Sequence, residues 1–223
     1  MAVDGSGESG LLGDSAFHAL RAELRQGGIR AGQFLTMPGL VQALGYPIAA
    51  VREAVKRADA AGLLTVLPKR GVVVMDAGAD TTRACMDMRA VLDTEGARRR
   101  IATGALSALA ELQAAHRAML DEARRSPSPA LSPRAIETDL SLHDYLAAGL
   151  SNPHLQAAYA MNRDRIAVIQ ASRAFLADRV QGAMEEHLAI LAALAAGDAA
   201  ACAAAIRHHY DQTLRWWGID PAD

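Results

Sequence analysis

The N-terminal third of the chain carries apolar residues at the three- and four-residue spacing of amphipathic helices. In "DSAFHALRAELRQ" this spacing predicts a helix over residues 14–26. A short extended piece follows in "GGIRAGQFLT". Thr36 can then cap a second helix over "MPGLVQAL", because its hydroxyl can accept a hydrogen bond from a free backbone N–H. Gly45 would end that helix in the left-handed conformation that glycine adopts readily.

The next segment, "PIAAVREAVKRADAAG", predicts a third helix that starts at Pro47 and ends at Gly62. Val51, Val55 and Ala58 share one face of this helix, so we expect that face to be buried. Two runs of β-type residues, "LLTVL" and "GVVVM", are joined by "PKRG", which is typical of a hairpin. Three helices followed by a hairpin are the elements of a winged helix-turn-helix domain.

The remaining two thirds of the chain predict only helices. We expect six, near residues 81–102, 105–124, 134–150, 153–169, 171–196 and 198–217. They are separated by Gly104, "RSPSPALSP", "SNP", a weak break near Gln170, and Gly197-Asp198. No strand pattern interrupts them. The fold class is therefore mainly α, with an N-terminal winged helix-turn-helix and a C-terminal all-α bundle.

These patterns divide the chain into five parts. We expect a disordered N-terminus over residues 1–13, the winged helix-turn-helix domain over 14–76, a linker over 77–80, the helical domain over 81–217 and a tail over 218–223.

Composition narrows the location of the protein more than its function. The chain is 51% hydrophobic with a net charge of −2, which does not by itself indicate a nucleic-acid-binding protein. Cys85 and Cys202 are its only cysteines, which fits a reducing compartment, although one disulfide between them stays open. The N-terminus lacks the pattern of a signal peptide, and no apolar run is long enough to span a membrane. We therefore expect a cytoplasmic protein with no membrane partner.

Polar residues interrupt the apolar faces of three of the C-terminal helices. Asp139 and His143 are four residues apart, so they are stacked on one side of their helix beside its apolar residues. His187 falls on the apolar face of the next-to-last helix. His209 shares the inward side of the last helix with the following residues: Cys202, Ile206, Thr213 and Trp216. Its neighbour His208 lies instead with Gln212 and Arg215.

Four buried polar groups need partners, because burying an unpaired carboxylate or imidazole costs several kcal/mol. A divalent metal ion would satisfy all four, and imidazole with carboxylate suits Zn, Ni, Mn or Fe, with Zn, Ni or Mn favoured here. The alternative is a buried Asp–His pair together with two unrelated core histidines.

Several segments together carry a family resemblance that covers nearly the whole chain after residue 14. They are "LRAELRQGGIRAGQFLT", "VREAVKRADAAGLL" and "PKRGVVV" in the first part, then "MRAVLDTEGARRRIA", "DLSLHDYL", "SNPHL" and "EEHLAILAALAAGDAAACAAAIRHHY". The chain resembles the GntR family of bacterial transcription regulators, in its FadR-type branch with an FCD ligand-binding domain. Each segment alone is weak. The Asp-x-x-x-His pair, the later Glu-His, the Gly-Asp and the final histidine are specific as a set.

The resemblance implies a divalent metal ion at the bottom of a central cavity, with Asp139, His143, His187 and His209 as its ligands. Such a site would carry a net charge near +1 and open positions, which suits a carboxylate. The implied effector is thus a small organic acid. Arg89 lies on the inward side of its helix and can hold a carboxylate bidentately. The alternative for Arg89 is a surface ion pair with Asp93 at i+4.

The resemblance also implies a double-stranded DNA operator bound by a homodimer. One winged helix-turn-helix domain, called the head below, is small and contacts one half-site. The predicted DNA-contacting residues are Ala49, Arg52 and Lys56 on the third helix and Lys69, Arg70 and Gly71 on the wing. Between Gly45 and Gly71, five lysines and arginines stand against two acids, a local charge of +3 that favours phosphate contact.

One short stretch departs from the family pattern. Where the family has Ser-Arg-Thr-Pro at the start of the recognition helix, this chain has Pro-Ile-Ala-Ala over residues 47–50. The polar side chains that would contact phosphates and base edges are missing. Arg52 could still contact guanine, and Ile48 or Ala49 a thymine methyl group. We therefore expect weak, salt-tolerant DNA binding, or an operator unlike those usual in the family.

The sequence thus predicts a bacterial DNA-binding transcription regulator whose helical domain binds a divalent metal and a small carboxylate effector, and which is not an enzyme. One alternative is a dimer that binds ligand and metal with weakened or lost DNA binding. A second is a metal-dependent enzyme, for which Glu185 or Glu186 would have to act as the base.

Overall fold

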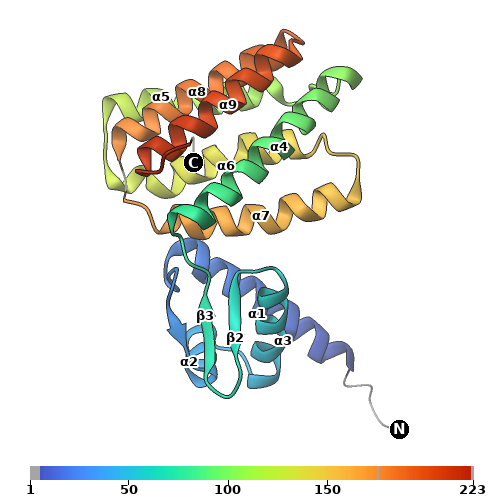
Figure 1. The fold of residues 1–223 in the computed structure, drawn as a ribbon, viewed down its shortest axis with the longest axis vertical. Helices are drawn as coiled ribbons and strands as arrows, with labels where there is room; N and C mark the ends of the chain where they lie inside the picture. The colour runs from blue at the N-terminus through green and yellow to red at the C-terminus, as the bar shows by residue number, and fades with distance from the viewer. Residues whose placement is uncertain (1–5, 175, 222–223) are drawn as a thin grey trace. The chain divides into compact units, whose positions relative to one another are not determined.

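The computed structural model describes residues 6–174 and 176–221, and Figure 1 labels its helices and two of its strands, β2 and β3. The chain forms two compact units. The first comprises the residues up to Thr82 together with Met161–Ser172, and the second comprises the rest.

The N-terminal part of the first unit has the predicted order of three helices and a hairpin. Its elements are α1 (Ser6–Gln26), β1 (Phe34–Leu35), α2 (Met37–Leu44), α3 (Ile48–Ala60), β2 (Leu64–Leu67) and β3 (Gly71–Val74). The sheet order is β1-β3-β2, and both pairs are antiparallel. Val72 of β3 lies opposite Val66 of β2 on one side and Leu35 of β1 on the other. The predicted winged helix-turn-helix is therefore confirmed.

The helix ends follow from the residues that the sequence singled out. The hydroxyl of Thr36 accepts a hydrogen bond from the N–H of Gly39 at 3.2 Å, which caps α2. Gly45 ends α2 with φ 71°, a conformation in which a side chain would be strained. Val51, Val55 and Ala58 of α3 are buried in the core of the unit, as their spacing predicted.

The N-terminus differs from the expectation of disorder over residues 1–13. Residues 1–5 lie outside the described residues, but α1 begins at Ser6. Small residues explain the extension. Gly13 and Ala16 face α3, where a Cβ on Gly13 would lie 3.2 Å from the Glu53 side chain and Ala16 packs with Ala54. Once a helix is anchored in this way, adding residues to its free end costs little.

The described residues of the second part of the chain form helices joined by short connections, with no strand among them. Its elements are α4 (Ala79–Thr103), α5 (Leu109–Arg125), a 3₁₀ turn (Pro129–Leu131), α6 (Ser132–Ala147), α7 (Pro153–Ala171), α8 (Ala177–Ala195) and α9 (Ala199–Trp216). All six predicted helices are present. The start of α4 at Ala79 takes up part of the segment expected as a linker. Gly104 ends α4 with φ 66°, and α5 starts later than predicted, after a residue with positive φ, Ala108.

The expected single helical domain over residues 81–217 is divided, because the C-terminal half of α7 belongs to the first compact unit. Within that unit, the Asp164 carboxylate binds Arg21 at 2.7 Å and Arg25 at 2.5 Å. Val168 is part of the same apolar core as Leu24 and Leu63 of the head. Hydrophobic spacing could not assign half of α7 to the first unit, because spacing identifies which face of a helix is buried but not the residues that pack against it.

Two glycines allow α4 and α6 to pack at backbone contact. A Cβ on Gly96 of α4 would lie 2.2 Å from the carbonyl oxygen of Leu146. A Cβ on Gly149 would lie 2.4 Å from the carbonyl oxygen of Gly96. Neither position can carry a side chain without a shift of the backbone. The contact fixes the spacing between α4 and α6, the helices from which Arg89, Asp139 and His143 project.

The structure also bears on three other predictions, which concern the two cysteines, Trp216 and membrane-spanning helices. Cys85 and Cys202 are both buried as free thiols, so they do not form the disulfide that was left open. Trp216 was expected on the inward side of α9 but is 40% exposed, because it lies in the last turn of the helix. Among the described residues, we find no helix with the length and apolar character needed to cross a membrane.

Candidate metal centre and DNA-binding face

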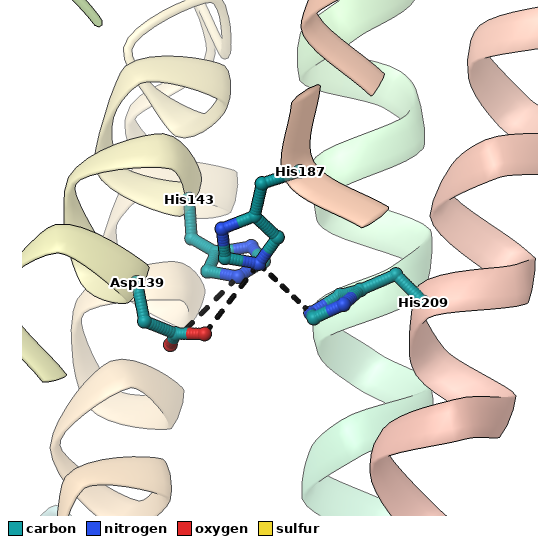
Figure 2. Close-up of side chains that lie close together, drawn as sticks. All are labelled: Asp139, His143, His187 and His209. Atoms are coloured by element: carbon teal, nitrogen blue, oxygen red, sulfur yellow. Dashed lines mark hydrogen bonds and ion pairs between the residues drawn. The ribbon is translucent and has the colours of Figure 1, made fainter. Parts of the chain in front are cut away.

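The four polar residues from three different helices converge on one point inside the second unit. Figure 2 shows Asp139 and His143 from α6 pointing toward His187 of α8 and His209 of α9. One ligand atom from each residue lies within 4.8 Å of the others. The three histidines are buried, and the side chain of Asp139 is 13% exposed. The four are neighbours, so the alternative of an Asp–His pair with two unrelated core histidines does not describe them.

Helix geometry accounts for the convergence. Asp139 and His143 lie one turn apart on α6, with His143 Nε2 4.0 Å from Asp139 Oδ2. His187 Nε2 lies 3.5 Å from Asp139 Oδ1 and 3.2 Å from His209 Nε2. On α9 the inward residue is His209, whereas His208 is exposed. The preference for His209 over His208, made from spacing alone, is confirmed by their burial.

Carboxylates hold two of the three histidines. The Nδ1–H of His143 donates to Asp93 Oδ2 at 2.6 Å, and the Nδ1–H of His209 donates to Glu186 Oε2 at 2.6 Å. A carboxylate accepts hydrogen bonds, so each of these imidazoles carries its proton on Nδ1 and turns the lone pair of Nε2 toward the centre. Arg179 donates in turn to Glu186 at 2.8 Å. This is the arrangement by which outer carboxylates orient metal-binding histidines.

Arg89 enters the same centre from α4. Its side chain is buried, with Nη2 3.1 Å from His209 Nε2 and Nη1 3.8 Å from Asp139 Oδ2. The sequence left open whether Arg89 points inward or forms a surface ion pair with Asp93, and in the structure it points inward. The surface pair with Asp93 is absent among the described contacts, because Asp93 is itself buried against His143. A fixed positive charge therefore lies at the edge of the cluster.

Burial sets the charge state of the centre. It lowers the pKa of His187 and of His209 well below the ordinary histidine value, and the neighbouring charges of His143 and Arg89 act in the same direction. Burial also raises the pKa of Glu186, although Arg179 opposes this. His187 and His209 are thus held neutral, which is the form in which imidazole binds a metal ion.

The residues fit a divalent metal ion. Ligand atoms bound at about 2.1 Å to one ion are at most about 4 Å apart, close to the spacing observed here. His143 Nε2 is buried, and no described residue forms a hydrogen bond with it. A lone pair that faces other lone pairs and a carboxylate is costly unless a cation is shared among them. The donor set of three imidazoles and one carboxylate matches zinc, nickel or manganese.

Several contributors to the centre were missed by sequence reasoning. Asp93 was considered only as a partner of Arg89, and Glu186 only as a possible base, while Arg179 and His116 were not considered. His116 is fully buried on α5 beside His187, with ring centroids 5.2 Å apart. Its position four residues after Leu112 and three before Met119 could have indicated an inward histidine.

The predicted DNA-contacting residues lie mostly on the surface of the first unit. Ala49, Arg52 and Lys56 are exposed on α3, and Lys69 and Arg70 are exposed at the hairpin turn. Gly71 differs, because it is the buried first residue of β3. A Cβ there would lie 2.2 Å from the carbonyl oxygen of Leu35, so Gly71 shapes the wing and exposes little to a ligand.

The positive charge of this face is smaller than the sequence count implied. Arg57 forms an ion pair with Asp14 of α1 and lies over the Phe17 ring at 4.5 Å, so it is engaged within the head. Lys56 is paired with Glu53 at 3.6 Å on the exposed side of α3. The first turn of α3 presents Ile48, which is 42% exposed, and its N-cap Pro47 offers no side-chain hydrogen bond.

Comparison with protein families agrees with both halves of the chain. Residues 12–74 match the model of bacterial regulatory proteins of the gntR family, and residues 84–212, more than half of the chain, match the FCD domain. The chain belongs to the GntR family and carries an FCD domain. It is therefore a DNA-binding transcription regulator, as the resemblance implied.

Solved structures support the fold of this GntR-family regulator. McbR/YncC of E. coli is 20% identical with a TM-score of 0.75, and the match covers 92% of this chain and 96% of the other. A GntR transcriptional regulator from Rhodococcus sp. RHA1 is 21% identical with a TM-score of 0.71, at the same coverage. No match is found among curated protein sequences. At such identities the structures inform the fold alone.

Proposed function

We propose that this GntR-family regulator binds one divalent metal ion at Asp139, His143, His187 and His209, and that a small carboxylate effector binds beside it and changes operator binding. The observation that carries the proposal is the convergence of four ligand atoms within 4.8 Å in a buried site. The two Nδ1–carboxylate bonds support it further, because they direct Nε2 lone pairs to the centre.

The charges of the site favour an anionic effector. Three neutral histidines and one aspartate leave a bound divalent ion with a net charge near +1, and Arg89 adds a second positive charge within the same cluster. The metal would supply Lewis acidity and open coordination positions for carboxylate oxygens. The guanidinium of Arg89 would orient the same carboxylate with two parallel N–H donors.

A pair of adjacent histidines tests the metal site. We expect His209→Ala to lose bound metal, because it removes one of four ligands. His208→Ala is the matched control, since His208 precedes it on the same helix but is exposed. Elemental analysis of the purified proteins after zinc loading and desalting gives the readout. Equal metal content in the two variants would refute the ligand assignment.

A second substitution tests the effector position. We expect Arg89→Met to weaken binding of a small dicarboxylate by about tenfold or more while metal content is retained, because a buried charged hydrogen bond is lost. Arg98→Met, on the exposed side of the same helix, is the control. Isothermal titration of the zinc-loaded proteins measures the difference. Similar affinities for both variants would place the carboxylate elsewhere.

Regulation would require the effector to favour one arrangement of the two heads of a homodimer over another, since a ligand shifts an equilibrium only by its difference in affinity. The head would bind DNA weakly and with little salt dependence, because residues 47–50 offer no polar side chain. The same observation favours a second candidate, a dimer that binds metal and ligand with weakened or lost operator binding. The enzyme alternative has less support, because Glu186 is bound to Arg179 and His209.

A further inference from the structure

His116 lies against the cluster but is not one of its four converging residues. It projects from α5, which packs against α8, and its side chain is completely buried beside His187. Its Nδ1 lies 2.8 Å from the carbonyl oxygen of Leu112. A carbonyl only accepts hydrogen bonds, so this contact places the proton of His116 on Nδ1.

The remaining nitrogen of His116 is thereby defined as an acceptor. With the proton on Nδ1, Nε2 of the neutral ring carries a lone pair. This atom is buried and forms no hydrogen bond with any described residue. A buried acceptor without a donor is destabilising, so this nitrogen is expected to serve a partner.

The complementary atom is on His187. His143 and His209 each have a carboxylate at Nδ1, but Nδ1 of His187 is buried and has no hydrogen-bond partner within the described part of the chain. His187 Nε2 faces Asp139 and His209 (Figure 2), so this is the atom that a metal would take. When Nε2 binds a metal, the proton of a neutral imidazole must be on Nδ1.

We propose that His116 is the positioning residue of His187: its Nε2 accepts the Nδ1–H of His187 and so holds His187 in the tautomer that offers Nε2 to the metal. In the other tautomer two lone pairs, one from each ring, would face each other in a buried space. The two rings are in direct contact, with their centroids 5.2 Å apart. Each of the three metal-facing histidines then has its own acceptor: Asp93, Glu186 or His116.

The acceptor proposed for His187 differs chemically from the acceptors of the other two histidines. Asp93 and Glu186 are carboxylates and can make their histidines more basic, whereas a neutral imidazole acceptor adds no charge. An imidazole suits this location, because His116 is completely buried beside His187 where α5 packs against α8, and the buried residues of that interface are apolar. A carboxylate there would need a further cation to offset its burial.

The role of His116 rests on the proposed metal site, and the experiment distinguishes a failure of that role from a failure of the metal site. Zinc affinity is measured by competition with a chromophoric chelator for the native protein, His187→Ala, His116→Phe and His116→Gln. Phenylalanine keeps the ring and removes the acceptor, while the glutamine Oε1 can replace it. We expect His116→Phe to lower zinc affinity by about 10- to 100-fold, and His116→Gln to remain within about threefold of native.

Nitrogen-15 spectra of histidine-labelled, zinc-loaded protein provide a readout that a purely structural role would not move. We expect a slowly exchanging Nδ1–H signal from His187 in the native protein, and its loss or fast exchange in His116→Phe. Thermal unfolding of the metal-free variants checks that both are folded.

The outcomes distinguish the two proposals. Native zinc affinity in His116→Phe, together with loss of zinc in His187→Ala, would overturn the role of His116 and leave the metal site standing. Equal weakening by phenylalanine and glutamine would also overturn it, because the acceptor would then not matter. A change in the visible spectrum of the cobalt-loaded protein from His116→Phe as large as that from His187→Ala would make His116 a ligand. Unchanged zinc affinity in His187→Ala would refute the metal site itself.

Discussion

Acidification should destabilise the metal-free protein steeply below about pH 6.5. Burial lowers the pKa of His116, His187 and His209, whereas in the unfolded chain each titrates near the ordinary value of about 6.5. Between the lowered and the ordinary value, the unfolded state binds protons that the folded state does not. The contribution of these neutral histidines to the free energy of unfolding is therefore fully present above about pH 6.5. It is lost as the pH falls, by up to about 1.4 kcal/mol per pH unit for each histidine.

Urea unfolding in the presence of a chelator, from about pH 7 to about pH 5, measures this slope. Glu186 acts in the opposite direction, because burial raises its pKa and the folded state takes up a proton earlier than the unfolded one. It can offset part of the loss only as the pH nears its titration range. We expect His116→Gln to reduce the slope by up to one histidine's contribution, and His208→Gln, at an exposed position, to leave it unchanged. A flat profile over this range would contradict the assignment of neutral, buried histidines.

Replacing Ile48 by arginine should strengthen DNA binding and increase its salt dependence. Ile48 is exposed in the first turn of α3, the part of a recognition helix that approaches DNA in helix-turn-helix domains. Each new phosphate contact is expected to steepen the slope of log K against log salt by about 0.9, so one contact from each head of a dimer would add about 1.8. Fluorescence anisotropy with a labelled duplex, at several salt concentrations, measures both the affinity and the slope.

Ala60→Arg is the control for this change. It adds the same charge to the same helix, at an exposed position at the opposite end. We expect a much smaller effect on the slope, because the C-terminal end of a recognition helix is farther from the bases. If the two variants behave alike, the first turn of α3 does not face DNA, and the account of weak binding given for residues 47–50 is wrong.

Helical spacing is what allowed the sequence to single out the four residues that converge at the candidate metal centre. Two residues four apart on one helix must share a face, so Asp139 and His143 could be paired, and the same rule separated His209 from His208. Spacing identifies an inward face but not the residues opposite it. The contacts of Asp93 with His143 and of Glu186 with His209 join different helices, and these were found only in the structure.

For the fold as well, spacing predicts the individual helices and strands but not the contacts between distant parts of the chain. Helices and the hairpin were predicted because each has its own local pattern and end signals, such as Thr36 and Gly45. The long start of α1 was not, because glycine at position 13 is unfavourable for a helix in isolation and acceptable only where it lets α1 approach α3. The association of residues 161–172 with the head depends on ion pairs to Asp164 from residues more than a hundred positions away.

The backbone contacts at Gly96 and Gly149 fix the helices that carry the residues of the proposed effector site. Arg89 projects from α4 and Asp139 from α6, and the nearest atom that an added methyl group would meet at either glycine is a backbone carbonyl oxygen. A regulator with every ligand residue intact could therefore become unresponsive through a single alanine at either glycine. Variants that lose response to the effector can arise at positions that contact neither metal nor effector.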